Sequence, residues 1–233
     1  MKKIEDSFII ENYYNELNMQ KIFTDDMKSE MRLLKFEKNE YLIREDEDLE
    51  YLLFFIQGKA KVFKTLPNGR SLLLDFYKPF RVIGDIEIVK NQSATGTIQA
   101  LSTCYCLAMP MEEARLKLIK DNKFLKFTCE SLAEKLAVVS MNSSINLLYP
   151  LENRLASYIN ESLIYGDDLY IDFDENLNNI AELLGSSYRH LLRTFNTLCK
   201  KGVLKREGGR YKIINKTLLK DLAGDLYQDA KFL

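Results

Sequence analysis

Short apolar stretches separated by turn residues fill the chain from about residue 31 to residue 109. Some alternate apolar with polar residues and others are continuous apolar runs; in order they are MRLLKF, YLIR, YLLFFI, KAKVFKTL, SLLLDFY, RVIG, GTIQAL and CYCLAM. Asn68-Gly69 lies between two of them and is a strong hairpin signal. Many short strands with regularly spaced turns are typical of a sandwich, jelly roll or barrel. We therefore expect residues 1–121 to form a domain built mainly of β-strands.

After Pro110 the pattern becomes helical, with a short helix MEEARLKLI and a long helix from about residue 122 to residue 148. Apolar residues on the long helix recur at spacings of four and three, which is the seam of a coiled coil. The same seam could instead pack on the chain's own β domain, and the pattern alone leaves both alternatives open. We interpret residues 122–149 as a dimerisation helix on the basis of this seam. Pro150 then marks the joint to a further unit. The expected dimerisation residues are Leu125, Cys129, Leu132, Leu136 and Val139.

Residues 150–233 predict a mixed unit: a helix LENRLASYINESLI, a strand LYIDF, helices NLNNIAELLG and SSYRHLLRTFNTLCKKG, a hairpin VLKRE and RYKII, and a last helix from about Lys216. Gly185 separates the two central helices and permits a tight turn, and Ser186 or Ser187 suits the N-cap of the second. The positions expected to face the core of that second helix are Leu191, Leu192, Phe195 and Leu198.

Polar and basic residues fall largely on the opposite side of that helix, as a helix-turn-helix that reads DNA requires. Arginine can contact guanine with two hydrogen bonds, while serine and tyrosine suit phosphate. A charged αα-hairpin is the simpler alternative. The glycine-serine turn, the following hairpin as a wing and the local charge together favour DNA. The expected DNA-binding residues are Ser187, Tyr188, Arg189, His190, Arg193, Asn196, Lys205 and Arg210.

Charge and composition sharpen this prediction. The net charge of the 233 residues is −1. Residues 186–216 nevertheless hold nine Lys and Arg against one acid, Glu207, or +8 locally. A basic block on an otherwise acidic chain suggests a polyanionic partner. Hydrophobic content of 46% and charged content of 29%, without a membrane-spanning run or a signal peptide, predict a globular cytoplasmic protein that does not enter the membrane. The single histidine, His190, and the absence of a nucleophile-base pair or metal set argue against an enzyme.

The segment IAELLGSSYRHLLRTFNTLCKKGVLKREGGRYKI resembles the C-terminal domain of the CRP/FNR regulators, and LLFFIQGKAKVFKTLPNGRSLLLDFYKPFRVIGDIEIV is similar to their β-roll. The resemblance runs from about Leu33 to Leu222, and CYCLAMP, NRLASYI and GSSYRHLL look most like the YeiL branch of that family. It implies an α+β chain with an N-terminal cyclic-nucleotide-binding-like β-roll (a jelly roll) as sensor, a long dimerisation helix and a C-terminal winged helix-turn-helix. It also implies a homodimer that binds double-stranded DNA and works with RNA polymerase.

The chain departs from the family at the phosphate-binding residue. Members that bind a cyclic nucleotide hold its phosphate with an arginine, where this chain has Ala94 or, in a shifted alignment, Gln92. A buried phosphate without that partner is poorly compensated, so we expect no binding of cAMP. Binding of another small effector stays an open alternative if Glu87 and Lys90 form a different pocket. We favour the simpler interpretation that both are surface loop residues. The candidate pocket residues are Gly84, Asp85, Glu87, Ala94, Thr95 and Ser140.

The recognition helix and the cysteines depart as well. The family's usual recognition-helix glutamate aligns with Arg189, while Arg193 matches its recognition arginine, so the family's DNA target is not carried over. Residues 1–103 contain no cysteine, unlike the cysteine-rich start of members that hold an iron-sulfur cluster. We expect Cys104 and Cys106 to face opposite sides of a strand and to be buried thiols. An arrangement in which Cys129 approaches one of them is the weaker alternative. We therefore expect no metal and no cofactor.

These observations predict a sequence-specific DNA-binding transcription regulator of the CRP/FNR type that does not respond to cAMP. Its expected parts are residues 1–121, 122–149 and 150–233. The alternative is a metabolite-binding or redox-responsive module whose C-terminal domain contacts protein rather than DNA.

Overall fold

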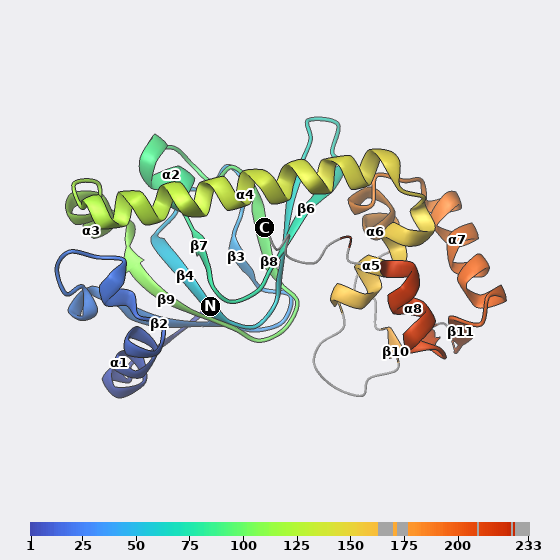
Figure 1. Cartoon of the computed structure of the whole chain (residues 1–233), viewed down its shortest axis with the longest axis horizontal. Coiled ribbons are helices and arrows are strands. Elements are labelled where there is room, and N and C mark those ends of the chain that lie inside the picture. Colours follow the sequence, from blue (N-terminus) through green and yellow to red (C-terminus); the bar gives the residue numbers. More distant parts are fainter. Residues whose placement is uncertain (163–169, 172–176, 209, 225, 227–233) are drawn as a thin grey trace. The chain divides into compact units, whose positions relative to one another are not determined.

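The computed structural model describes residues 1–233 except 163–169, 172–176, 209, 225 and 227–233 (Figure 1). The chain forms two compact units. The first comprises Met1–Val62 and Phe76–Ala137, and the second comprises Phe63–Asp75 and Val138–Leu233.

Two sheets form the β-roll, and every strand expected between residues 31 and 109 is present. The first sheet has the order β1-β2-β9-β4-β7, and each of its neighbouring pairs is antiparallel. Its strands are β1 (Lys2–Ile4), β2 (Arg32–Phe36), β4 (Tyr51–Gln57), β7 (Arg81–Ile83) and β9 (Cys104–Pro110). The second sheet has the order β3-β8-β5-β6 and comprises β3 (Tyr41–Ile43), β5 (Ala60–Thr65), β6 (Ser71–Tyr77) and β8 (Thr97–Ala100).

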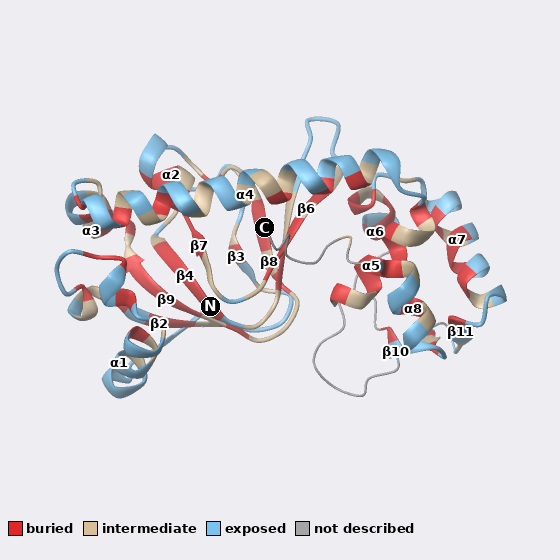
Figure 2. Ribbon diagram, viewed as in Figure 1, coloured by how far each residue is buried: buried red, intermediate tan, exposed pale blue. Residues whose placement is uncertain are grey.

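The first sheet is buried on both faces, which explains the continuous apolar run of β4. Side chains alternate along a strand, so Phe54 enters one hydrophobic core and Phe55 the other. In the first core, Phe23 packs edge-on against Phe54, with ring centroids 5.8 Å apart, and stacks on Phe124 at 6.1 Å. Figure 2 shows β4 and β9 as buried strands.

The same alternation corrects one prediction. Cys104 and Cys106 do not face opposite sides of β9: both lie in the same core cluster. The prediction was wrong because residues two apart on a strand share a face. Both are free and buried, and burial raises the pKa of Cys104 to about 11 and that of Cys106 well above the usual thiol value. Both thiols are therefore protonated at neutral pH.

Several short elements of the first unit were not predicted. They are α1 (Ser7–Glu16), the 3-10 turns η1 (Met19–Lys21) and η2 (Lys28–Glu30), and α2 (Asp85–Lys90), together with β1. The side chain of Asp6 caps α1 by accepting hydrogen bonds from the backbone N–H groups of Phe8 and Ile9, at 3.0 and 3.1 Å. The two predicted helices that follow Pro110 are α3 (Met111–Leu118) and α4 (Asn122–Leu148).

The second unit contains the predicted winged helix-turn-helix. Its helices are α5 (Leu151–Ser162), α6 (Leu177–Leu183), α7 (Tyr188–Lys200) and α8 (Lys216–Ala223). A three-stranded sheet has the order β10-β12-β11 and comprises β10 (Tyr170–Ile171), β11 (Leu204–Glu207) and β12 (Arg210–Ile213). The expected strand LYIDF corresponds to β10, and its last two residues lie outside the described part of the chain. None of the helices in the described ranges has the length and apolar character needed to cross a bilayer.

Candidate nucleic-acid interface

The turn between α6 and α7 is held by backbone hydrogen bonds and by a buried arginine. Gly185 adopts a φ of 59° and donates to the carbonyl of Glu182 at 2.8 Å, and the N–H of Ser186 reaches the carbonyl of Ala181 at 2.7 Å. Arg154 of α5 donates to the carbonyl of Leu184 through its guanidinium. Because these contacts satisfy the carbonyls at the end of α6, the start of α7 has a defined position relative to α5 and α6.

Ser187, rather than Ser186, caps the recognition helix. Its side chain accepts a hydrogen bond from the backbone N–H of His190 at 3.3 Å. The cap leaves the first turn of α7, including Tyr188 and Arg189, exposed at the helix N-terminus. That end carries a partial positive charge and suits a phosphate.

The two faces of α7 differ sharply in burial, and one core assignment needs correction. Thr194 is buried in the core-facing row, and its hydroxyl donates to the carbonyl of His190 at 3.0 Å, whereas Leu192 is only half-buried. The other three predicted core residues, Leu191, Phe195 and Leu198, are fully buried. All the residues that the sequence assigns to DNA are exposed: Ser187, Tyr188, Arg189, His190, Arg193, Asn196, Lys205 and Arg210.

The hairpin β11–β12 packs on the back of α7 through aromatic rings. Phe195 stacks on Tyr211 with ring centroids 4.4 Å apart, which ties the recognition helix to the hairpin. Lys205 pairs with Glu207 at 2.7 Å on the exposed hairpin. The hydrogen bond between them raises the pKa of Lys205 and lowers that of Glu207, so both groups are charged at neutral pH. The hairpin therefore presents an exposed basic wing beside α7.

At the candidate ligand pocket of the β-roll, the charges are already paired within the chain. Gly84 has a φ of 100° and precedes α2. Asp85 is buried and accepts hydrogen bonds from the ammonium group of Lys135 at 2.7 and 2.8 Å and from the hydroxyl of Ser131 at 3.1 Å. Lys135 also donates to the carbonyl of Val82 at 2.6 Å. Lys135 was not predicted as part of this pocket, although a lysine on the inward-facing side of a long helix indicates a partly buried ion pair.

Glu87 was expected on a surface loop, and this prediction was wrong. It is 3% exposed, and its carboxylate accepts hydrogen bonds from the backbone N–H and the hydroxyl of Thr95, at 3.0 and 2.9 Å. Burial is tolerated because both partners satisfy the carboxylate. Lys90 is exposed as expected, Ala94 is buried, and Ser140 is exposed on the part of α4 that belongs to the second unit. Within the first unit, the structure thus brings together Gly84, Asp85, Glu87, Ala94 and Thr95.

The predicted dimer seam faces away from the buried side of α4. Cys129 is exposed and Leu136 is 72% exposed. The remaining seam residues, Leu125, Leu132 and Val139, are half-buried. The buried positions of the helix form a different row: Phe124, Thr128, Val138, Asn142 and Ile145. Packing of the seam on the chain's own β domain is therefore not observed for Cys129 or Leu136.

Comparison with known proteins finds a matching domain family and relatives among regulatory proteins. The model of the cyclic nucleotide-binding domain family matches residues 33–121. The regulatory protein YeiL of Escherichia coli O157:H7 is 34% identical over 90% of this chain and 94% of its own. A CRP-like cAMP-activated global transcriptional regulator of Mycobacterium tuberculosis is 19% identical over 78% of this chain and 84% of its own.

Solved structures agree with the fold. A putative transcriptional regulator of the CRP/FNR family from Eubacterium rectale superposes with a TM-score of 0.74 at 18% identity. That alignment covers 91% of this chain and 99% of the other. Because this alignment covers nearly the whole of both chains, the structural similarity includes the β-roll, the long helix and the winged unit.

Proposed function

Since the chain belongs to the CRP/FNR family of DNA-binding transcription regulators, we propose that it acts as a homodimer that reads an inverted DNA repeat through α7. The observation that carries the proposal is the exposed polar face of α7, set by the Ser187 cap and backed by the buried row of Leu191, Phe195 and Leu198. The basic wing beside it supplies sequence-independent attraction to phosphates.

Arg189 and Arg193 are the proposed reading residues. They are four positions apart, so they share one face of α7, and both are exposed. An arginine fork donates two parallel hydrogen bonds to the O6 and N7 acceptors of guanine in the major groove. In a homodimer, two such helices would lie about one helical turn of DNA apart, which favours an inverted repeat.

Arg193→Ala is the direct test of this reading role. We expect it to weaken binding to the specific site by roughly 1–3 kcal/mol and to relax the preference at one base pair. Lys205→Ala should instead weaken all sequences about equally and lower the salt slope by roughly one unit, which is the effect expected of a lysine that contacts phosphate. A titration of both variants against specific and scrambled duplexes at two salt concentrations measures both effects.

Arg193 is not a reading residue if Arg193→Ala folds normally and binds the specific duplex as well as the wild type does. If wild-type association with the duplex did not weaken as salt rises, a protein partner for the second unit would replace DNA in the proposal.

We also propose that the β-roll does not respond to cAMP, although one relative is named as cAMP-activated. Three features of the structure support this. No arginine occurs between Arg81 and Arg115, so the loop after α2 offers no guanidinium to a cyclic phosphate. Asp85 is already bound by Lys135, and Glu87 by Thr95. A cyclic nucleotide would have to displace these internal partners, and its phosphate would find Lys135 already paired with the buried carboxylate of Asp85.

The expected result with cAMP is no change. At physiological concentration, cAMP should neither raise the melting temperature nor tighten DNA binding, because a ligand stabilises a protein only in proportion to its binding. Calorimetric titration of the full chain measures this, with the Mycobacterium tuberculosis relative as positive control. A saturable cAMP signal would overturn the proposal for the β-roll while leaving the DNA-binding role intact.

Three further parts complete the proposal, the first two by analogy with the family and the third from the cysteines of this chain. RNA polymerase is the proposed protein partner, the proposed location is the cytoplasm, and the proposed chain works without a metal or iron-sulfur cofactor. The last point is supported by the buried, protonated thiols of Cys104 and Cys106, since thiolates are the form that binds metals.

A further inference from the structure

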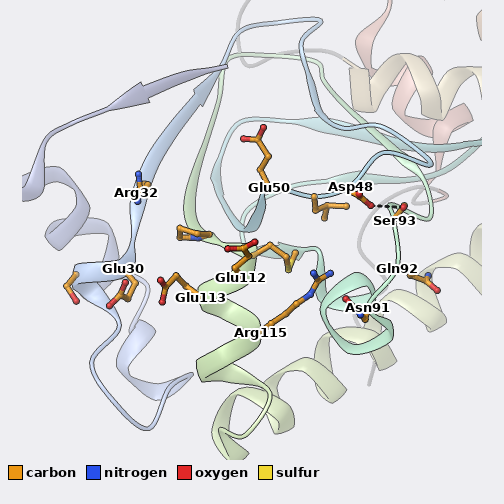
Figure 3. Close-up of a pocket in the computed structure, with 14 residues that line it drawn as sticks. Glu30, Arg32, Asp48, Glu50, Asn91, Gln92, Ser93, Glu112, Glu113 and Arg115 are labelled. Atoms are coloured by element: carbon orange, nitrogen blue, oxygen red, sulfur yellow. Dashed lines mark hydrogen bonds between the residues drawn. The ribbon is translucent and has the colours of Figure 1, made fainter.

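A cavity of about 750 Å³ opens at one end of the β-roll, within the first unit (Figure 3). Four stretches of the first unit line it: residues 29–32 around the start of β2, residues 48–50 before β4, residues 91–93 after α2, and residues 110–115 at the start of α3. Its volume lies within the range of roughly 300–1,000 Å³ that is typical of small-molecule sites. Asp85, Glu87 and Lys135 do not line it, so it is separate from the candidate pocket discussed above.

Part of the charge around the cavity is already paired. Lys117 binds Glu30 at 2.6 Å and lies 3.7 Å from Glu113. Asp48 accepts a hydrogen bond from the hydroxyl of Ser93 at 2.8 Å, which joins two of the lining stretches. These contacts fix the wall of the cavity and account for three of its five carboxylates.

Arg115 is the residue that points to a ligand. It belongs to α3, and in Figure 3 its side chain extends from that helix toward α2. Its Nε–H is buried, and no described residue accepts a hydrogen bond from it. That nitrogen has almost no accessible surface, so a ligand in the cavity would meet the remainder of the Arg115 guanidinium, whose planar fork is shaped for a carboxylate or a phosphate.

The other charged groups restrict which anion fits. The carboxylates of Glu50 and Glu112 and the guanidinium of Arg32 are exposed and line the same cavity. A bare anion would be attracted by Arg32 and Arg115 but repelled by these carboxylates, and a bare cation would leave both guanidinium groups without an anionic partner in the cavity. A molecule that carries a carboxylate and an ammonium group a few bonds apart satisfies both sides.

We propose that this cavity binds a zwitterionic ligand of the amino acid or short-peptide class. Arg115 holds the carboxylate of the ligand, and Glu112, one turn earlier on α3, holds its ammonium group with Glu50. The site makes no use of the DNA-binding face, so its failure and the failure of the proposed function are distinguishable.

The experiment is calorimetric titration of the full chain, without DNA, with the common L-amino acids and their glycyl dipeptides. Each compound that binds is then tested as its N-acetyl form, which lacks the ammonium group, and as its C-terminal amide, which lacks the carboxylate. We expect at least one zwitterion to bind saturably. Both of its blocked forms should bind at least roughly tenfold more weakly, because each loses a charge-assisted hydrogen bond. Absence of any saturable zwitterion, or equal binding of the blocked forms, overturns the proposal.

Variants locate the site. Arg115→Gln should weaken the bound zwitterion by roughly tenfold or more. Lys120→Gln removes the same charge from an exposed position outside the cavity and should leave the affinity unchanged. Glu112→Gln alters an exposed residue and so tests the site even if Arg115→Gln fails to fold; it should weaken the zwitterion but not its N-acetyl form. Equal losses in Arg115→Gln and Lys120→Gln, or an unchanged affinity in Glu112→Gln, would show that the ligand binds elsewhere.

Discussion

Lys135→Ala should lower the free energy of unfolding by roughly 3–5 kcal/mol, because it leaves the Asp85 carboxylate buried without its cation. The Asp85 side chain is 2% exposed and that of Lys135 is 14% exposed, and their charged atoms are 2.7 Å apart. Burial acts to lower the pKa of Lys135, but its electrostatic interactions and hydrogen bonds with Tyr77 and Asp85 outweigh it, so the pKa is raised and the ammonium stays charged at neutral pH. Urea denaturation of the full chain measures the loss.

A matched control lies on the same helix. Lys126 is exposed and forms a surface ion pair with Glu130 at 3.8 Å. Because water screens such pairs, Lys126→Ala should change stability by less than about 1 kcal/mol. The double variant Asp85→Leu with Lys135→Met removes both charges and should recover much of the loss, since an apolar pair can replace a buried ion pair. Equal stability losses in Lys135→Ala and Lys126→Ala would show that the buried pair does not stabilise the fold.

This ion pair has a consequence for the β-roll. It joins α4 to the start of α2 through the chain's own charges. The position of α4 at Lys135, between the predicted seam residues Leu132 and Leu136, is therefore fixed without a ligand at Asp85. Lys135, a residue of the chain itself, supplies the positive charge that a ligand would otherwise have to bring to Asp85.

The sequence predicted the strands well because each has a buried apolar face, and burial imposes a visible period on the residues. The long helix and the winged helix-turn-helix were predicted for the same reason. The short helix α2 was missed because its six residues, DIEIVK, alternate apolar with acidic side chains as a strand does. Its helical form depends on tertiary partners of Asp85 and Glu87, which lie far along the chain or across a loop.

Burial of charged residues was the harder part of the site to predict. Glu87 was placed on the surface because carboxylates are rarely buried without partners, and the partner Thr95 becomes adjacent only after the chain folds. The ion pair of Lys135 and Asp85 joins residues 50 positions apart, a distance at which periodicity carries no information. On α7, by contrast, burial follows helical spacing, so the exposed face was predictable apart from the exchange of Leu192 for Thr194 in the core-facing row.

Leu136→Asp should convert the proposed homodimer to a monomer. Leu136 belongs to the seam row and is 72% exposed in the single chain. In a symmetric dimer each seam residue meets its copy or a neighbour, so the substitution would place two carboxylates in an apolar interface. We expect dimerisation to weaken by roughly 3–5 kcal/mol, or at least a hundredfold in the dissociation constant. Sedimentation equilibrium measures this shift.

Leu116→Asp is the matched control, because Leu116 is 74% exposed on α3 and does not belong to the seam. Both substitutions change an exposed leucine, so neither should destabilise the monomer, and only Leu136→Asp should dissociate the dimer. The consequence for DNA follows from geometry. A dimer gains the second half-site of an inverted repeat at a high effective concentration, whereas a monomer binds each half-site alone. Leu136→Asp should therefore lose most of its preference for the full repeat over a single half-site, while Leu116→Asp keeps it. A wild type that sediments as a monomer at micromolar concentration, or a Leu136→Asp variant that remains dimeric, would show that this row of α4 is not the dimer seam.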